Sequence, residues 1–345
     1  MYAYTYTEYG NPDVLNYVEL PTPMPNANEV LIRVCATTVS AGDWRARSLT
    51  MPAGLGLVGR LVFGIMRPRK SILGTELSGI IEGVGADVTA FKSGDPVIGF
   101  PGATFGAHAE YITMPADGKI VFKPENVSFE EAAAIPFGAT TAYDFLINKG
   151  NLSAGERVLV NGASGSVGSA CVQLAKYFGA EVTGICSAAN ASLVREIGAD
   201  HVIDYNAEDF ARGGPLYDIV VDAVGTAPWF RTRHALLPKG RMLMIAGSMS
   251  DMILGGLKAR LDGKRLIGGV ASEDVSILRE VVDLTAAGDF HPVIDRTFDF
   301  SQMVSAHAHV DTGHKTGNAV VTTTPAGKKD LHANKYLQFM QTAHV

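Results

Sequence analysis

The chain has 345 residues, and its 47% hydrophobic residues and 38 glycines are typical of a globular α/β protein with room for two domains. A formal net charge of -6 excludes the broad basic surface of a general nucleic-acid-binding protein. The N-terminus lacks the basic start and apolar stretch of a secretory signal, so we expect a cytoplasmic protein. Cys35, Cys171 and Cys186 fit a reducing compartment, because none has a neighbouring ligand at zinc-finger spacing.

Residues 1–122 are expected to form a compact β domain. Residues 29–36 alternate as a strand does, and glycines punctuate the short strands that follow. Ser128 and Glu131 then form a capping box, and Pro136 is expected to kink or end the helix that this box begins.

Strands and helices alternate through the middle of the chain, where helix-length segments separate five apolar runs. The runs occupy residues 158–160, 182–185, 201–203, 219–221 and 242–245. This alternation predicts a doubly wound parallel sheet, to which residues 264–270 would add an edge strand.

Two short segments near the C-terminus, 292–295 and 317–321, resemble strands of the first domain and follow an expected helix around 273–287. They would return to complete that domain. We therefore divide the chain into a first domain of residues 1–122 and 271–323, a second domain of residues 123–270, and a C-terminal extension of residues 324–345. The extension is expected to be a terminal helix or a frayed tail.

Residues 157–168 carry the strongest functional signal. An apolar strand runs here into a glycine-rich turn that opens a helix, with the pattern Ala163-x-Gly165-x-x-Gly168. Glycines let the backbone approach a dinucleotide diphosphate closely, and the free N–H groups of the helix face its negative charge. Apolar residues then recur at helical spacing and leave Gln173 towards the outer side of the helix.

The end of the next strand, 181–186, bears on the choice between the two nicotinamide cofactors. NAD-specific folds usually carry an acidic residue there, whose carboxylate bonds the ribose 2'-hydroxyl and repels a 2'-phosphate. This chain has Cys186 and then Ser187, with Asn190 and Tyr205 as further hydrogen-bonding groups. We expect NADPH, with NADH as the alternative because no Arg or Lys stands in the immediate turn.

Several short motifs accompany the glycine loop. They are VLIRV at 30–34, DWR at 43–45, GTELSG at 74–79, GDPV at 94–97, AEY at 109–111, TTAY at 140–143 and GADHVIDY at 198–205. With these motifs, roughly residues 1–323 resemble the medium-chain dehydrogenase/reductase superfamily, in its zinc-independent quinone oxidoreductase-like branch. The resemblance implies an α/β fold with a GroES-like β domain, a Rossmann domain, and a cleft between them in which the nicotinamide meets the substrate.

The resemblance and the glycine loop together indicate the cofactor contacts. They are Thr140, Ala163, Gly165, Ser166, Val167, Gly168, Ser187, Asn190, Tyr205, Val224, Ala246, Gly247 and Asn318. The resemblance also implies a homodimer that forms through the last strand of the central sheet, near residues 264–270.

Zinc-dependent relatives carry Cys and His ligands that are missing here. Thr75 stands where those relatives have His, and residues 40–43 contain no Cys. Asp43 and Glu76 alone cannot complete a site of three protein ligands and a water. We therefore predict no metal site and an enzyme that works without zinc.

Without a metal, the protein must supply orientation, a dry cleft and a hydrogen-bond donor for the developing oxyanion. The candidate donors are Ser40, where relatives place an Asn beside the nicotinamide, and Tyr143. Each also has a structural interpretation, as a turn serine and a packed tyrosine.

The resemblance implies a reductase that transfers a hydride from NADPH to a small apolar quinone or α,β-unsaturated carbonyl. One alternative is an NAD(P)-dependent alcohol/ketone oxidoreductase, although an unactivated alcohol is hard to oxidise without a Lewis acid or a placed base. A second alternative, of another class, is a cofactor-binding protein that interacts with RNA or a membrane surface and has little turnover. The negative charge argues against RNA, and we expect no nucleic-acid partner.

Residues 51–66 form an unusual apolar insertion ahead of Arg67, Arg69 and Lys70. The insertion is too short, and too interrupted by Arg60 and glycines, to span a bilayer, so we predict no transmembrane segment. The resemblance to the family implies, from the position of this segment, a flexible wall over the substrate cleft. The alternatives are a packed loop or dimer contact, and a patch that binds a membrane surface.

Overall fold

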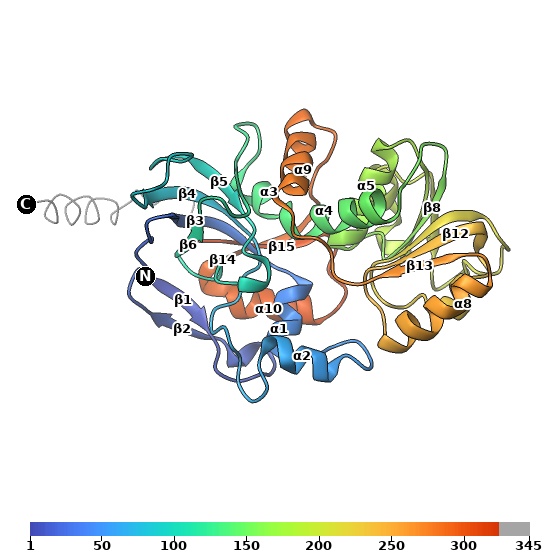
Figure 1. Ribbon diagram of the computed structural model, residues 1–345, viewed down its shortest axis with the longest axis horizontal. Helices are drawn as coiled ribbons and strands as arrows, with labels where there is room; N and C mark the ends of the chain where they lie inside the picture. The colour runs from blue at the N-terminus through green and yellow to red at the C-terminus, as the bar shows by residue number, and fades with distance from the viewer. Residues whose placement is uncertain (324–345) are drawn as a thin grey trace, which may run out of the picture.

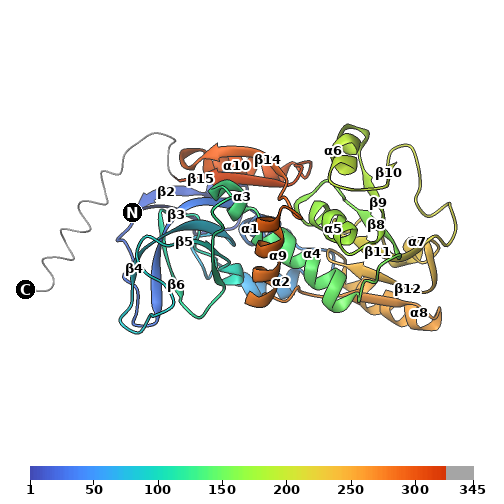
Figure 2. The same cartoon turned by 90° about the horizontal axis from the view of Figure 1, so that it is seen from above.

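Two β-sheets organise residues 1–323, which are the residues that the computed structural model describes. A seven-stranded mixed sheet and a six-stranded parallel sheet lie towards opposite ends of the molecule (Figure 1). Helices α4 (Pro136–Tyr143) and α9 (Val275–Ala287) lie between them in both views (Figure 2). The predicted α/β architecture is confirmed, and the predicted extension 324–345 lies outside the described residues.

Both ends of the described chain build the mixed sheet, whose strand order is β14-β15-β3-β4-β5-β7, with β6 also paired to β3. Its strands are β3 (Glu29–Val39), β4 (Leu77–Val84), β5 (Pro96–Gly99), β6 (Tyr111–Pro115), β7 (Ile120–Phe122), β14 (Ile294–Asp299) and β15 (Asn318–Thr322). Because β15 pairs with β3, the C-terminal segments return to the first sheet as the sequence predicts. A separate antiparallel pair consists of β1 (Tyr2–Thr5) and β2 (Asn16–Glu19).

The other sheet has the order β10-β9-β8-β11-β12-β13 and is parallel throughout. Its strands are β8 (Arg157–Asn161), β9 (Glu181–Cys186), β10 (His201–Asp204), β11 (Tyr217–Asp222), β12 (Leu236–Met244) and β13 (Arg265–Gly268). Every predicted apolar run lies in or overlaps a strand, and β13 is the predicted edge strand. The strand order reverses between β8 and β11, and ligands of doubly wound sheets bind outside the carboxyl ends of the strands at such a point.

Strand β8 is buried on both faces because its side chains alternate. Val158 and Val160 join a core with residues of α4, α9 and α5 (Ser166–Tyr177), whereas Leu159 joins the core on the opposite face with Trp229 of α7 (Trp229–Thr232). The remaining helices are α1 (Ala41–Ser48), α2 (Gly56–Phe63), α3 (Phe129–Ala133), α6 (Ala191–Glu196), α8 (Gly256–Leu261) and α10 (Met303–Asp311). Within residues 1–323, no helix has the length and apolarity needed to cross a membrane.

The capping box predicted at Ser128 is confirmed. Ser128 Oγ accepts from the Glu131 N–H, and the Glu131 carboxylate accepts from the Ser128 N–H, so α3 begins there. Helix α3 ends at Ala133 and Pro136 opens α4, which suits a residue without an N–H group.

The outward position predicted for Gln173 is wrong. The structure buries this side chain, whose amide donates to His291 O at 2.9 Å and accepts from His291 N at 2.9 Å. The pairing fixes the backbone just ahead of β14 against α5.

Leu278 and Val281 of α9 pack into the same core as residues of α5, although the predicted division gives α9 to the first domain. The domain boundaries stay a prediction.

Candidate active site

The predicted strand, glycine loop and helix over residues 157–168 are present as β8, a tight turn and α5. Gly162 has a φ of +82°, and a Cβ on Gly168 would stand 2.0 Å from Gly162 O. A Cβ on Gly165 would meet only Gly162 O, at 3.6 Å, so the outer side of the loop is open. A phosphate group can therefore approach the backbone closely at this loop.

The first turn of α5 carries polar groups that lack partners. Ser166 Oγ is buried, and no described residue bonds to it. The first N–H groups of a helix also have no acceptor inside the helix, and this turn holds no acidic side chain. An orphaned hydroxyl and free N–H groups beside an open glycine loop fit the diphosphate of a dinucleotide.

The residues predicted to hold the adenosine end gather near the ends of two neighbouring strands. Ser187 directly follows β9, and Tyr205 directly follows β10, its parallel neighbour. Asn190 Nδ2 donates to Ser164 Oγ at 3.1 Å, which ties this turn to the glycine loop. Tyr205 is 57% exposed and is therefore accessible to a ligand.

Asp222, which the sequence analysis did not single out, shapes the neighbouring loop. Its carboxylate ends β11, is buried, and accepts from Asn161 Nδ2 and from three N–H groups of residues 224–227. Burial raises the pKa of Asp222, and these donors oppose that shift. The bonds hold Val224 directly against the glycine loop, where a Cβ on Gly162 would meet it at 2.4 Å. The sequence signal that could have identified Asp222 is its position as an acidic residue at the end of an apolar strand.

The other predicted cofactor residues lie around the same strand ends. Ala246 and Gly247 follow β12, and Ala246 lies next to Gly225 of the loop that Asp222 holds. The Thr140 hydroxyl donates to a carbonyl of α4 at 2.5 Å, and the Asn318 amide donates to a backbone carbonyl at 3.0 Å. The Thr140 hydroxyl proton and one Asn318 amide proton are therefore already bound to carbonyl oxygens of the protein.

A segment that belongs to the mixed sheet docks directly on the glycine loop. Gly317 N donates to Ser164 O at 2.7 Å, and Gly317 forms a parallel bridge with Gly165. The Lys315 ammonium donates to Gly317 O within this contact. Burial lowers the pKa of Lys315 to about 8, and nearby carboxylates, Glu76 first, oppose the shift. Lys315 is therefore mainly cationic at neutral pH beside the loop.

Ser40 begins α1 at the junction of the two sheets. Its hydroxyl donates to Asp43 Oδ2 at 2.6 Å, and its oxygen accepts from Asp43 N at 3.2 Å and Thr75 Oγ1 at 2.9 Å. Ser40 is thus the N-cap of α1, which agrees with its structural interpretation. A Cβ on Gly42 would lie 3.3 Å from the Phe137 ring, so this cap faces the start of α4.

Glu76 connects the mixed sheet to the start of α4. Its buried carboxylate accepts from the Thr38 hydroxyl and, at 2.6 Å, from Phe137 N. Burial raises the pKa of Glu76 to about 8, against the effect of those two bonds. At the same end of α4, a Cβ on Gly138 would stand 2.6 Å from Ser166 Oγ. The cap of α1, the start of α4 and the start of α5 therefore meet in one place.

Tyr143, the second catalytic candidate, lies away from this junction. Its ring packs edge-on against Phe178, with 6.1 Å between the ring centres, and Phe178 follows the last residue of α5. A helix rises about 1.5 Å per residue, so the length of α5 separates Tyr143 from the glycine loop. The structure places the phenol at the far end of that helix, and the catalytic role of Tyr143 stays a prediction.

The acidic residues of the junction do not fit a zinc site. Asp43 accepts from Ser40, from Gly74 N at 2.8 Å and from Thr75, while Glu76 is held as described above. Zinc takes Cys, His and carboxylate ligands in a tetrahedral set, and neither Cys nor His joins these two carboxylates. Across residues 1–323, no group of three or more His, Cys, Asp or Glu side chains is placed to hold a metal ion.

Comparisons by sequence and by fold both relate this chain to dehydrogenases and quinone oxidoreductases. Residues 26–125 match the family described as Alcohol dehydrogenase GroES-like domain, and residues 197–321 match the family described as Zinc-binding dehydrogenase. The chain is 31% identical to the quinone-oxidoreductase homolog, chloroplastic, of Spinacia oleracea over 93% of this chain and 98% of that protein.

Two further relatives extend this comparison. The 2-methylene-furan-3-one reductase of Solanum lycopersicum is 31% identical over 94% of this chain and 80% of its own length. The solved structure of the quinone oxidoreductase from Coxiella burnetii covers 94% of this chain and 99% of its own with a TM-score of 0.83 at 28% identity. The chain belongs to the medium-chain dehydrogenase/reductase superfamily, in its quinone oxidoreductase-like branch.

Membership in this branch makes the protein an NAD(P)H oxidoreductase. Such a protein needs groups that hold a dinucleotide, and the glycine loop, the orphaned Ser166 hydroxyl and Lys315 are our candidates for them. The names of relatives include chloroplastic and mitochondrial proteins, and the cytoplasmic location expected from the N-terminus stays a prediction.

Proposed function

We propose that this oxidoreductase uses NADPH to reduce a small apolar quinone or α,β-unsaturated carbonyl, and that it does so without zinc. The observation that carries the proposal is the junction of three helix starts. There the start of α4 lies against the first turn of α5 on one side and against the Ser40-capped start of α1 on the other, and the carboxylates present do not fit a metal. The printed names of relatives, which include quinone oxidoreductases and a furanone reductase, support this substrate class.

The residues of the loop would hold and orient the cofactor. The first turn of α5 with Ser166 would bind the diphosphate, and Lys315 would add a cationic contact to it. Ser187, Asn190 and Tyr205 would surround the adenosine ribose, and the turn directly after β9, residues 187–190, holds no acidic residue to repel a 2'-phosphate. The bound cofactor supplies the hydride, and the protein supplies position, exclusion of water and a proton donor.

Ser40 remains our candidate donor for the oxygen that gains negative charge. Its proton lies on the bond to Asp43, so the hydroxyl must turn away from Asp43 to reach a substrate oxygen. Thr75 Oγ1 donates to Ser40 Oγ and would stay its partner after that rotation, while Gly74 N continues to satisfy Asp43. A donor aimed at the developing oxyanion stabilises an enolate or hydroquinone anion.

Oxidation of simple alcohols is the weaker alternative. An alcohol that is not activated needs a Lewis acid or a positioned base to lose its proton. The two carboxylates at the junction, Asp43 and Glu76, are each engaged by backbone and hydroxyl donors, and within residues 1–323 they belong to no group of three side chains placed to hold a metal ion. A protein whose main role is interaction would bind NADPH but oxidise it on no acceptor, which the assay below distinguishes.

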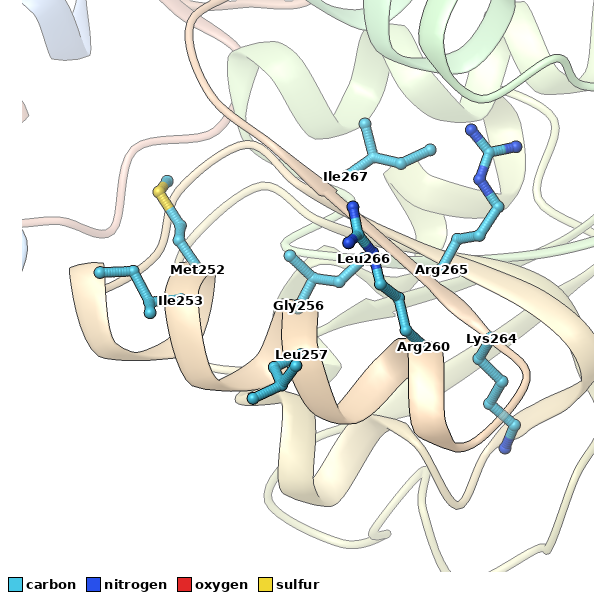
Figure 3. A pocket seen from close by; sticks show the side chains of 9 residues that line it. All are labelled: Met252, Ile253, Gly256, Leu257, Arg260, Lys264, Arg265, Leu266 and Ile267. Carbon is cyan, nitrogen blue, oxygen red and sulfur yellow. The ribbon is translucent and has the colours of Figure 1, made fainter.

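We also propose a homodimer that forms along β13. Among residues 1–323 this strand pairs with β12 alone, which leaves its other edge open. Beside it lies a groove of about 530 Å³ between β13 and α8 (Figure 3). Leu257 and Leu261 of α8 are 62% and 78% exposed, and Val270 is 89% exposed. Light scattering at the monomer mass would contradict this assembly.

The function is tested by following NADPH and NADH oxidation on metal-stripped protein with a quinone, a long-chain enone and an aldehyde. The oxidised cofactors with a secondary alcohol complete the set. Turnover of quinone or enone with NADPH supports the proposal. Activity that appears only after zinc is added, or only with the alcohol, would overturn it. Protection against thermal unfolding by NADPH without any turnover would favour the interaction protein.

A further inference from the structure

The segment 57–70, which we call the α2 segment, exposes apolar side chains to an unusual degree. Leu57, Leu61 and Met66 are 72%, 52% and 88% exposed. Val58, Val62 and Ile65 are also exposed. Six large apolar residues within ten positions thus face outwards on one short stretch of chain. Scattered exposed apolar residues are ordinary, but a contiguous group of this kind marks an interaction surface.

Internal contacts hold the α2 segment in this orientation. Gly59 is the buried position of helix α2, and the ring of Phe63 packs towards Phe105, with 6.2 Å between the ring centres. Just after the helix, Tyr9 Oη donates to Gly64 O at 2.8 Å. The inner side of the segment is therefore fixed to the first domain, and its apolar outer side is a built feature of the fold.

The charged residues along the α2 segment itself are all cationic. Arg60, Arg67, Arg69 and Lys70 are exposed, and the sequence contains no Asp or Glu from residue 44 to residue 75. Among the described residues, none of these four cations forms an ion pair with a carboxylate. The chain as a whole carries a net charge of -6, so this basic and apolar surface is a local feature.

The α2 segment also stands at the edge of the junction between the two halves. Met249 N, on the loop that follows β12, donates to Ala53 O at 3.0 Å, immediately ahead of α2. Ala53 thus reaches the loop that carries Ala246 and Gly247. Figure 1 shows α2 on the lower side of the molecule, between the mixed sheet and α8.

We propose that the α2 segment docks this protein on the surface of an anionic lipid membrane. Its leucine, isoleucine, valine and methionine side chains enter the boundary between headgroups and acyl chains, while its four cations contact lipid phosphates. This arrangement has the two components that interfacial segments combine, apolar burial and attraction to anionic lipid. A second copy of the chain is disfavoured as the occupant, because a two-fold contact through this patch would bring its cations together.

The test is co-sedimentation of the full chain with vesicles of phosphatidylcholine, with and without phosphatidylglycerol. We expect binding only to the vesicles that contain phosphatidylglycerol. Leu57→Ser with Leu61→Ser should weaken it at least about tenfold. Arg67→Gln, Arg69→Gln and Lys70→Gln together should weaken it on the order of a hundredfold, because each cation near anionic lipid contributes roughly a factor of five.

Val84→Ser with Leu216→Ser is the matched control, because it removes two exposed aliphatic side chains that lie outside both the α2 segment and the proposed β13 contact. We expect this variant to bind vesicles as the unmodified chain does. Equal thermal unfolding midpoints for all proteins would show that each variant is folded. Equal binding to both lipid compositions, or unchanged binding after the α2 substitutions, would overturn the proposal. A lower mass in light scattering for the Leu57 and Leu61 variant, without vesicle binding by any form, would assign the patch to a second copy.

Discussion

Gly317 pairs with Gly165, so the chain passes directly from a contact with the glycine loop into β15, the last strand of the mixed sheet. Gly317 has a φ of +52°, and a Cβ there would stand 2.1 Å from Val293 O. Only glycine combines this backbone conformation with this close approach. The contact makes the position of Lys315 depend on the glycine loop, and the first two predictions follow from it.

Gly317→Ala should lower both stability and cofactor affinity. The added Cβ must displace Val293 and with it the hydrogen bond to Ser164, in addition to a backbone penalty of about 1–2 kcal/mol for a left-handed residue. Gly313→Ala is the control, since Gly313 has a φ of +70° but open space around its Cβ position. Thermal unfolding and the KM for NADPH measure the two effects. Equal losses for both variants would show that the contact with the loop does not matter.

Lys315→Met should raise the KM for NADPH roughly tenfold with little change in kcat, because one charge-assisted contact to phosphate is lost. Lys315→Arg should retain most of the affinity. The ammonium is charged below its pKa of about 8 and neutral above it, so cofactor affinity should fall as the pH rises through about 8. A KM that is flat from pH 7 to 9, for the unmodified protein and for Lys315→Met alike, would remove Lys315 from the site.

Ser187→Asp should reverse the cofactor preference. A carboxylate at this position, directly after β9, would repel the 2'-phosphate and accept from the 2'-hydroxyl of NADH. We expect kcat/KM with NADPH to fall on the order of a hundredfold while that with NADH is kept or rises. Asn190→Arg should act in the opposite direction. An unchanged ratio of the two kcat/KM values in Ser187→Asp would show that the adenosine end binds elsewhere.

Ser40→Ala separates a catalytic from a capping role. Loss of the cap alone should cost about 1 kcal/mol of stability and leave turnover intact. If Ser40 donates to the oxyanion, kcat should fall at least tenfold with an unchanged KM for NADPH. Ser128→Ala, which removes the cap of α3, is the matched control for stability. Unchanged kcat in Ser40→Ala would remove Ser40 from the mechanism.

A buried pair of histidines should make the fold sensitive to mild acid. His307 Nδ1 accepts from Arg47 Nε at 3.2 Å, so its Nε2 is left to donate towards His108 Nδ1 at 3.5 Å, and His108 Nε2 then donates to Thr38 O at 3.0 Å. Burial lowers the pKa of both rings. The neighbouring Asp43 opposes the shift at His108, and at His307 the neighbouring His108 and Arg47 reinforce it.

Folding therefore favours the neutral rings. Their stabilising effect is complete above the ordinary pKa of 6.5 and is lost as the pH falls below it, by roughly 1 kcal/mol per ring over one pH unit. His307→Gln keeps an acceptor for Arg47 and a donor for His108 but does not titrate. Denaturant unfolding from pH 7 to 5 should show a shallower decline for this variant. Parallel declines in both proteins would contradict the account.

The sequence predicts the architecture well because local patterns decide it. The apolar runs at β8 and β11 and the capping box at Ser128 depend on residues close in the chain, and they form as expected. The glycine loop is equally local. Relationships between distant segments were not predictable in this way, since no periodicity shows that Gly317 docks on Ser164 or that Gln173 is buried against His291.

In the candidate site too, features set by neighbouring residues could be predicted, and features set by distant segments could not. The residues around the glycine loop could be found from one motif, whereas Asp222 acts through a loop and Glu76 through a helix start in another part of the chain. Tyr143 is the last residue of the TTAY motif, but its ring packs against Phe178 at the far end of α5. His307 has no sequence signal that marks it as buried, and it is buried because the inner face of α10 packs into the core. In each case tertiary packing decides the outcome.

The central claim is zinc-independent reduction by NADPH, and one measurement tests it most directly. The fall in NADPH absorbance is followed with a quinone and a long-chain enone, using protein stripped of metal by a chelator and checked for residual zinc. The account predicts turnover on at least one of these acceptors, unchanged when zinc is returned and faster with NADPH than with NADH. Turnover that is absent until zinc is added would contradict it.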